Sequence, residues 1–410
     1  MGDGPQVLIV NASWGWAREE GLDIQQLMNG MCATVPPGGR LMGTDGRSVF
    51  DVDLSDPSHV EPLGSWRLLI RMRIDVAHVY MVLPPLHLLL AILLRVRGVP
   101  VVCTPIGMLG RNFATASWFK PNSRSRQRLK PFQVAVWAWC WRVVASGFFC
   151  LGQDEARQAG LPMSRCALAP MPVPISELAS AIPAAASPQA RTIESGSVER
   201  PVALVSRFDP YRKGFDRISH WVAEYASELP RPAVRVFAAS PEGVTEIGLG
   251  EHHGWVHWDP DTRGAALAPA LMACRAVILL SRWEGQPRVL REAALLGIPT
   301  ISTACGNFCE VVTAIGAGVV VDGDRPEEIN AAFVAVATHP RDPSRARAIF
   351  DPKRIAAYQW QVLEAVARSE EFPASYYELF TAQYAVASPE SADLARGDVV
   401  GSSESVEGSS

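Results

Sequence analysis

The stretch AVILLSRWEGQPRVLREAALLGIPTIST, residues 276–303, contains the pattern that decides the fold. Its two ends, AVILL (276–280) and PTIST (299–303), are short apolar runs of the kind that form buried strands. Between them a helix is predicted over 288–296, with one apolar face made of Val289, Leu290, Ala293 and Leu296. Gly297 then provides a left-handed helix end, and Pro299 prevents the helix from continuing. A strand, a helix and a strand in this order predict a parallel sheet.

The same alternation of strand and helix occurs along most of the chain. In the second half, further strands are predicted at 202–206, 234–238 and 318–322, with helices near 214–228 and 264–274. In the first half, strands are predicted at 6–10, 76–80, 99–103 and 147–152, with helices at 86–96 and 126–145. We therefore expect an α/β fold made of two doubly wound, Rossmann-like domains.

The boundaries of the expected domains follow changes in composition. Residues 176–200 are rich in Ala, Ser and Pro without a sustained period, which predicts a linker at 177–199 between a first domain at 1–176 and a second at 200–369. Closing helices at about 370–385 are expected to complete the first domain. The polar, acidic and Ser-rich residues 386–410 are predicted to form a disordered tail.

The composition is that of a globular protein, because 48% of the 410 residues are hydrophobic and 20% are charged. Eight cysteines without a CxxC pair favour reduced thiols and a cytoplasmic location. The N-terminal residues lack a basic segment and a long apolar one, so no signal peptide is expected. The net charge is −4, yet residues 76–153 contain nine Lys and Arg and no Asp or Glu. This basic region is predicted to face an anionic partner.

Charged residues follow two predicted strands of the second half, at the edge where ligands of open α/β sheets bind. Arg207 comes directly after the strand at 202–206, and Lys213 precedes the next helix. Together with the free amides of Arg288 and Val289 at a helix start, these cations favour a diphosphate ligand. Two solvated loop cations are the simpler alternative for Arg207 and Lys213 taken alone.

Two carboxylates, Glu284 and Glu292, lie on either side of one loop-to-helix boundary. Glu284 is predicted to accept hydrogen bonds from sugar hydroxyls, and Glu292, about one turn into the helix, from a ribose diol. For Glu292 in isolation, an ordinary exposed helical Glu is the simpler interpretation. Its coincidence with two cations and a helix N-terminus at neighbouring strand ends favours a binding site.

Segment 281–312, SRWEGQPRVLREAALLGIPTISTACGNFCEVV, resembles the E-x7-E motif of glycosyltransferase family 4. SRFDPYRKGFDRI (206–218) resembles that family's Arg…Lys-Gly motif, and VPVVCTPIGML (99–109) is similar to its acceptor-domain stretch. The resemblance implies a GT-B fold, in which two Rossmann-like domains face each other across a cleft. It also implies transfer of a sugar from a UDP- or GDP-sugar donor with retention of anomeric configuration, and no metal or other cofactor.

The resemblance also implies roles for individual residues. The catalytic residues would be Glu284, Arg207 and Lys213. The donor site would comprise Arg207, Lys213, Glu284, Gly285, Arg288, Val289, Glu292 and Glu310. Ile106 and Gly107 are acceptor-side candidates, and Ile106 stands where many relatives have His or Arg. A non-catalytic nucleotide-sugar-binding scaffold of a glycan assembly complex is therefore the alternative to an enzyme.

Two further groups of residues have side chains suited to binding or catalysis. His78 and Tyr80, at the end of the strand at 76–80, are expected to face the same cleft from the acceptor side, with a buried core histidine as the alternative. Cys305 and Cys309 have no second pair of ligands nearby, so no metal site is predicted. Neither half has a GxGxxG turn after a strand, which argues against a nicotinamide-dependent oxidoreductase.

The segment 120–144 joins clustered cations to an aromatic run. Lys120, Arg124, Arg126, Arg128 and Lys130 precede Trp137, Trp139 and Trp141. This pattern predicts contact with an anionic membrane surface, although some of the tryptophans must pack on the sheet. We therefore expect a cytoplasmic protein, peripheral on the inner face of the cell membrane, that acts on a glycan or lipid-linked acceptor in surface polysaccharide or glycolipid biosynthesis. No nucleic-acid partner is expected.

Overall fold

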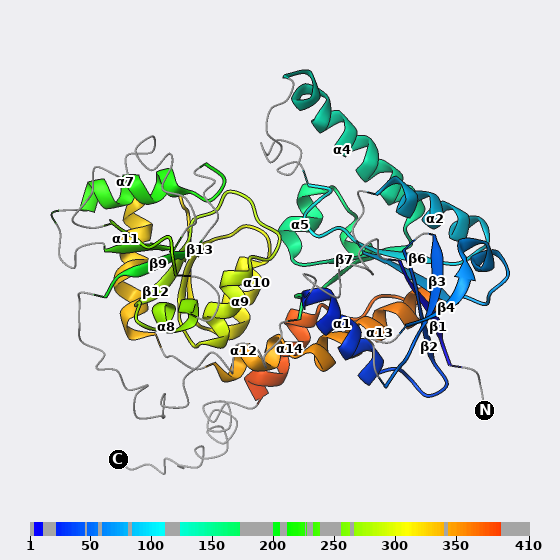
Figure 1. Ribbon diagram of the computed structural model, residues 1–410. Helices are drawn as coiled ribbons and strands as arrows, with labels where there is room; N and C mark the ends of the chain where they lie inside the picture. The colour runs from blue at the N-terminus through cyan, green and yellow to red at the C-terminus, as the bar shows by residue number, and fades with distance from the viewer. Residues whose placement is uncertain are drawn as a thin grey trace, which may run out of the picture.

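The computed structural model describes residues 4–10, 22–45, 47–55, 60–80, 84–110, 124–172, 200–205, 211–225, 227, 233–237, 256–262, 266–339 and 343–386. The predicted linker, the predicted tail beyond residue 386, and Arg207 lie outside these ranges. Within them the chain forms two sheets that are covered by helices (Figure 1). The α/β fold class predicted from the sequence is therefore confirmed.

The first sheet has eight strands in the described ranges, in the order β4-β3-β2-β1-β5-β6-β7-β8. The strands are β1 Gln6–Val10, β2 Arg40–Thr44, β3 Ser48–Val52, β4 Val60–Ser65, β5 Val76–Tyr80, β6 Val101–Thr104, β7 Gly147–Cys150 and β8 Cys166–Leu168. Neighbouring strands are parallel along the series β2-β1-β5-β6-β7-β8. Strand β3 is antiparallel to β2, and β4 is antiparallel to β3. Every residue of β5, β6 and β7 is buried, as expected for strands covered on both faces.

Helices cover both faces of the first sheet. The helices of this part of the chain are α1 Leu22–Ala33, η2 Trp66–Ile70, α2 Pro85–Val96, α4 Arg124–Val144, α5 Gln153–Gln158 and η3 Met163–Arg165. The connections β5-α2-β6 and β6-α4-β7 both advance in one direction along the sheet. Since such crossovers are right-handed, α2 and α4 lie on the same face, and α1, which connects strands in the opposite direction, lies on the other.

The second sheet has six parallel strands in the described ranges, in the order β11-β10-β9-β12-β13-β14. They are β9 Val202–Val205, β10 Val234–Phe237, β11 Val256–Trp258, β12 Ala276–Leu279, β13 Thr300–Thr303 and β14 Gly318–Val321. The helices are α7 Phe215–Tyr225, α8 Leu267–Met272, α9 Arg288–Leu295, α10 Phe308–Ile315, α11 Pro326–Ala335, η7 Val336–Thr338 and α12 Ser344–Ile349. Gly297 after α9 has a φ of 69°, which confirms the predicted left-handed helix end.

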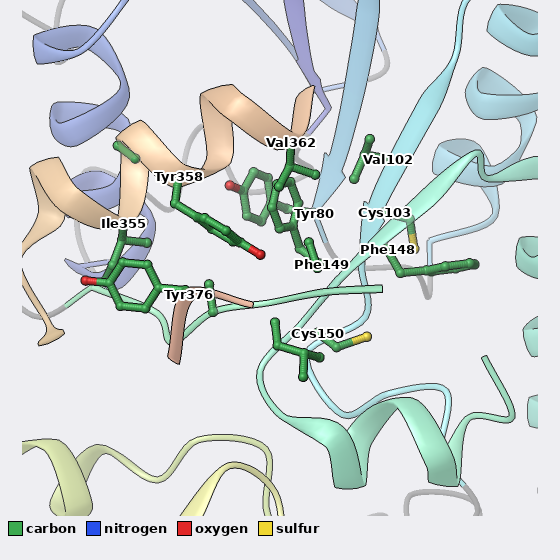
Figure 2. Packing of buried hydrophobic residues seen from close by; sticks show 14 of the residues in the cluster. Tyr80, Val102, Cys103, Phe148, Phe149, Cys150, Ile355, Tyr358, Val362 and Tyr376 are labelled. Carbon is green, nitrogen blue, oxygen red and sulfur yellow. The ribbon is translucent and has the colours of Figure 1, made fainter. Parts of the chain in front are cut away.

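The chain returns to the first domain earlier than expected. Helix α13 (Pro352–Arg368), which was placed in the second domain, packs on α1, and the indole of Trp360 donates to the carbonyl of Met31 at 3.1 Å. Figure 2 shows Val362 of this helix beside Tyr80 of β5, with Tyr358 and then Ile355 further along the helix. Helix α14 (Tyr376–Val386) follows it. Both helices, and not α14 alone, therefore complete the first domain, because the apolar side of α13 is buried and the helix packs on α1 and β5.

Candidate active site

Two adjacent cations, Arg212 and Lys213, lie in the turn immediately before α7. The turn closes with Gly214, whose φ is 71° and where an added Cβ would collide with the carbonyl of Leu280. The amide of Arg282 donates to the carbonyl of Arg212 at 2.8 Å. The turn is thus held against the end of β12, at the edge of the sheet where the carboxyl ends of β9 and β12 meet.

The carboxylate of Glu284 binds both cations. Lys213 Nζ donates to Oε1, Arg212 Nη2 donates to Oε2 at 3.1 Å, and Ser281 Oγ donates to Oε1 at 3.3 Å. The side chains of Glu284, Arg212 and Lys213 are only 6%, 14% and 16% exposed, and the guanidinium of Arg212 also lies 4.3 Å from the ring of Trp283. Two positive charges and one negative charge are therefore held together, largely shielded from bulk water. The cluster has a net charge of +1 at the end of a strand.

Helix α9 begins beside this cluster in the sequence. Its N-cap residue is Pro287, which has no hydroxyl or carboxylate to satisfy the first-turn amides of Arg288 and Val289. One turn further along, Arg288 Nε donates to Glu292 Oε1 at 2.6 Å, and the Glu292 side chain is 13% exposed. Glu292 is therefore largely shielded and turned back toward the helix start, where a ligand bound to the free amides would lie.

The acceptor-side candidates Ile106 and Gly107 lie against the turn that follows Glu284. A Cβ added to Gly107 would be 3.7 Å from the Cα of Gly285. Ile106 has a φ of 52°, which is rare for a β-branched residue, and Gly107 has a φ of 74°. The carboxylate of Glu155 holds this loop, because it accepts the amide of Gly107. The structure thus brings the acceptor-side loop and the donor-side turn together.

Glu155 is itself an unusual carboxylate. It is 5% exposed, and its second oxygen accepts the amide of Leu151 at 2.6 Å. Burial raises its pKa to about 7, Asp154 adds to the rise, and the two amide hydrogen bonds oppose it. Its ionisation therefore falls near neutral pH, next to the junction of the two domains.

Glu310 lies elsewhere than expected. The resemblance implied a place in the donor pocket, but Glu310 Oε1 accepts the amide of Gln153, at the start of α5 in the first domain, at 2.6 Å. In return, Asp154 Oδ2 accepts the amide of Gly306 at 2.9 Å. Burial raises the pKa of Glu310. Its observed role is a contact between domains, which arises because α10 and α5 begin close to one another.

His78 and Tyr80 do not face a cleft. Both have no exposed surface, and their rings lie 4.1 Å apart. His78 Nε2 pairs with Thr104 Oγ1 at 2.7 Å, and the hydroxyl of Tyr80 donates to Gln359 at 3.3 Å. Burial lowers the pKa of His78 to about 3, so its ring is neutral at pH 7. The acceptor-side expectation is corrected in favour of the alternative, a core histidine, because α13 covers this end of the strand.

Other expectations concern metals and membranes. Among the residues that the structure describes, no group of three or more His, Cys, Asp and Glu side chains is arranged to hold a metal ion. Cys305 is buried and Cys309 is exposed. No described helix combines the length and the apolar character needed to cross a membrane.

Three residues of the site and its surroundings were not predicted from the sequence. Arg212 and Ser281 both bind Glu284, and Glu155 holds the acceptor-side loop. Arg212 could have been selected because it adjoins Lys213 in the same turn. Glu155 carried no such signal, since an acidic residue in the first turn of a helix is common. Arg207 cannot be placed, as it lies outside the described ranges.

Comparisons with known proteins give one family match and several similar structures. The family model of glycosyl transferases group 1 matches residues 201–349, which include the cluster. Sucrose-phosphate synthase from Thermosynechococcus elongatus is similar in structure, with a TM-score of 0.51 and 15% identity over 94% of this chain and 100% of that one. The catalytic domain of starch synthase IV from Arabidopsis thaliana, bound to ADP and acarbose, gives a TM-score of 0.52 and 12% identity over 90% and 100%.

A third solved structure, an α,α-trehalose-phosphate synthase (UDP-forming) from Burkholderia vietnamiensis, gives a TM-score of 0.52 and 10% identity over 90% of this chain and 99% of that one. A search of curated protein sequences finds no match. At these identities the structural likeness establishes the fold alone. The chain therefore has the GT-B fold, and its second domain, over residues 201–349, matches the glycosyl transferases of group 1.

Proposed function

We propose that the protein is a retaining, family 4-like glycosyltransferase that moves a hexose from a nucleotide-sugar donor to a glycan or lipid-linked acceptor. One observation carries the proposal. The largely buried cluster of Arg212, Lys213 and Glu284 lies at the carboxyl ends of β9 and β12, inside the segment that matches group 1 glycosyl transferases. Ligands of doubly wound sheets bind at this edge.

The cluster suits a diphosphate because its cations are held in place before any ligand binds. Glu284, Ser281 and the ring of Trp283 fix the positions of Arg212 and Lys213, so little side-chain freedom is lost on binding. The donor's phosphates would share these cations with Glu284 and would accept hydrogen bonds from the free amides at the start of α9. Glu292 would then accept hydroxyls of the ribose. UDP- and GDP-sugars are the donors that we expect.

Bond cleavage builds negative charge on the departing nucleoside diphosphate. Lys213, Arg212 and the α9 amides would stabilise that charge in the transition state, a type of interaction that lowers the barrier directly. The acceptor hydroxyl attacks the anomeric carbon from the face that the phosphate leaves, and its proton passes to the departing phosphate oxygen. Attack on that face gives retention. Glu284 is freed to bind sugar hydroxyls as the phosphates take over its cations.

The acceptor would approach from the side of the loop at Ile106 and Gly107, since this loop lies against Gly285. The acid-free region 76–153 of the same domain supports an acceptor bound to an anionic lipid. We therefore propose a role in cell-surface polysaccharide or glycolipid biosynthesis, at the inner face of the cell membrane. The proposal requires no metal ion.

The test measures release of nucleoside diphosphate from a panel of nucleotide sugars, with and without glycan acceptors, in a metal-free buffer. The wild-type protein should hydrolyse or transfer one donor, and Lys213→Ala should lower kcat/KM by roughly 10²–10³, the typical effect of losing one charge-stabilising group. Lys353→Ala, which removes an exposed lysine of α13, is the matched control and should keep full activity.

Three outcomes would contradict parts of the proposal. A protein whose melting temperature rises with a nucleotide sugar but which neither hydrolyses nor transfers it would be a binding scaffold. A Lys213→Ala variant that is folded and fully active would remove the cluster from the donor site. A product of opposite anomeric configuration, detected by the proton coupling constant of the transferred sugar, would rule out retention.

A further inference from the structure

Helix α4 is apolar on the face that it turns away from the protein. Phe132, Val136, Trp139 and Val143 recur every three or four residues, so they form one stripe, and they are 68%, 41%, 59% and 63% exposed. The opposite face, which includes Val134, Ala138 and Trp141, is buried against the domain. A helix that is apolar on both faces is normally covered on both. Of the two tryptophans on these opposite faces, Trp139 is exposed and Trp141 is buried.

Helix α2 repeats this arrangement. Leu86, Leu89, Ile92 and Val96 are spaced three or four residues apart and are 38%, 62%, 41% and 81% exposed. The other side of α2, with Leu88, Leu90 and Leu94, is buried. The two helices contact each other on the same face of the first sheet and stand at its outer side in Figure 1. Two neighbouring exposed apolar stripes are more than the isolated surface residues of an ordinary soluble protein.

The charge of this region selects the kind of partner. Residues 76–153, which include both helices, contain nine Lys and Arg and no acid. A symmetric contact between two copies of the chain would place two such basic regions together, which like-charge repulsion disfavours. An anionic lipid surface instead satisfies both features, because the headgroups attract the cations while the apolar stripes enter the boundary of the acyl chains.

We propose that α2 and α4 together form a docking face that binds the protein to anionic lipid bilayers. Both helices lie along the bilayer, since their inner faces are packed on the sheet. The indole of Trp139 and the ring of Phe132 enter the interfacial layer, where aromatic side chains are most stable. Docking does not depend on the donor site, so it stands or falls separately from the proposed transfer reaction.

The experiment is sedimentation with vesicles of phosphatidylcholine alone or mixed with phosphatidylglycerol, at low and at high salt. The full-length wild-type protein should pellet with the anionic vesicles at low salt and less at high salt. Trp139→Ser and Leu89→Ser should each weaken binding roughly tenfold, and the double variant roughly a hundredfold, because each loses the burial of one large apolar side chain. Leu379→Ser, at an exposed leucine of α14, is the matched control and should bind as wild type.

Two controls separate docking from other effects. Lys213→Ala should bind vesicles as wild type even though it is expected to lose transfer, and unchanged melting temperatures would show that the serine variants are folded. The inference is overturned if the wild-type protein stays in the supernatant with anionic vesicles at low salt. It is also overturned if the double variant pellets equally well, or if sedimentation velocity shows a dimer that the double variant converts to a monomer.

Discussion

Replacing Glu155 with glutamine should remove a pH dependence from the stability of the first domain. The Glu155 carboxylate is buried. Among the described residues, only the backbone amides of Gly107 and Leu151 donate hydrogen bonds to it. Burial raises its pKa from 4.5 to about 7. The folded protein therefore binds this proton more tightly than the unfolded chain does.

The sign follows from proton linkage. Between pH 4.5 and about 7 the folded state holds the Glu155 proton and the unfolded state releases it, so the stability from this group falls as pH rises and then levels off above the folded pKa. The rise in pKa corresponds to a loss of about 3 kcal/mol, at roughly 1.4 kcal/mol per pKa unit. The glutamine side chain of the Glu155→Gln variant cannot ionise. The stability of the variant should therefore not fall over this pH range. The variant should instead have a smaller loss of stability that is the same at every pH, because the glutamine amide group cannot accept both backbone hydrogen bonds.

The assay is thermal unfolding of wild type and Glu155→Gln across this pH range, analysed as the difference between the two proteins. The difference is needed because His78, whose pKa is lowered to about 3, gives the opposite slope below pH 6.5 in both. Wild type should lose its advantage over the variant as the pH rises from 4.5 to about 7, and the difference should then level off. Glu371→Gln, at an exposed glutamate, should run parallel to wild type. A constant difference between wild type and Glu155→Gln would refute the reasoning.

The remaining predictions concern the proposed donor site and the turn at Gly214. Glu284→Gln should leave the affinity for a free nucleoside diphosphate unchanged or tighter by calorimetry, because both cations lose their neutralising partner, while transfer falls. Glu292→Gln should weaken that affinity about tenfold through loss of roughly one charged hydrogen bond, and equal losses in the two variants would contradict the division of roles. Gly214→Ala should lower the melting temperature more than Gly98→Ala, because both glycines have positive φ but only Gly214 also lacks space for a Cβ. Equal shifts would show that the turn moves away from Leu280.

The buried parallel strands were predictable and the edge strands were not. Runs such as VALV in β9 and AVIL in β12 are apolar at every position because helices cover both faces. Strand β4, VEPLGS, contains an acid, a proline and a glycine, and is exposed at the sheet edge. Its backbone pairing with β3 forms without any apolar pattern, so a search for periodicity passes over it.

The position of α13 shows a different limit. Its sequence predicts a helix. Asp351 caps the start of this helix, because its side chain accepts a hydrogen bond from the amide of Arg354 at 3.0 Å. The apolar residues indicate which side of the helix is buried, but no property of the helix alone indicates which sheet that side covers. That choice depends on the shape of α1, where Gly30 leaves room for the backbone of Pro352.

At the candidate site, local chemistry was predictable and contacts between domains were not. The meeting of Lys213 with Glu284 follows from the order of β9 and β12, whose carboxyl ends share one edge. The position of Glu310 depends on where the first domain places α5. A single strand end gives no information about the opposite domain, so a carboxylate near a ligand and a carboxylate at a domain contact have the same local sequence pattern.

Three contacts between the domains share a form that explains how the two sides of the site are aligned. Glu310 and Asp154 each accept a backbone amide from the opposite domain, and Gln286 exchanges hydrogen bonds with the backbone of Met171 at 2.7 and 3.2 Å. A hydrogen bond to a backbone group fixes the position of that segment of the chain, whatever side chains the segment has. Gln286 directly follows Gly285, so its two bonds set the position of the donor-side turn against Gly107. Domain alignment and site geometry are therefore set by the same few residues.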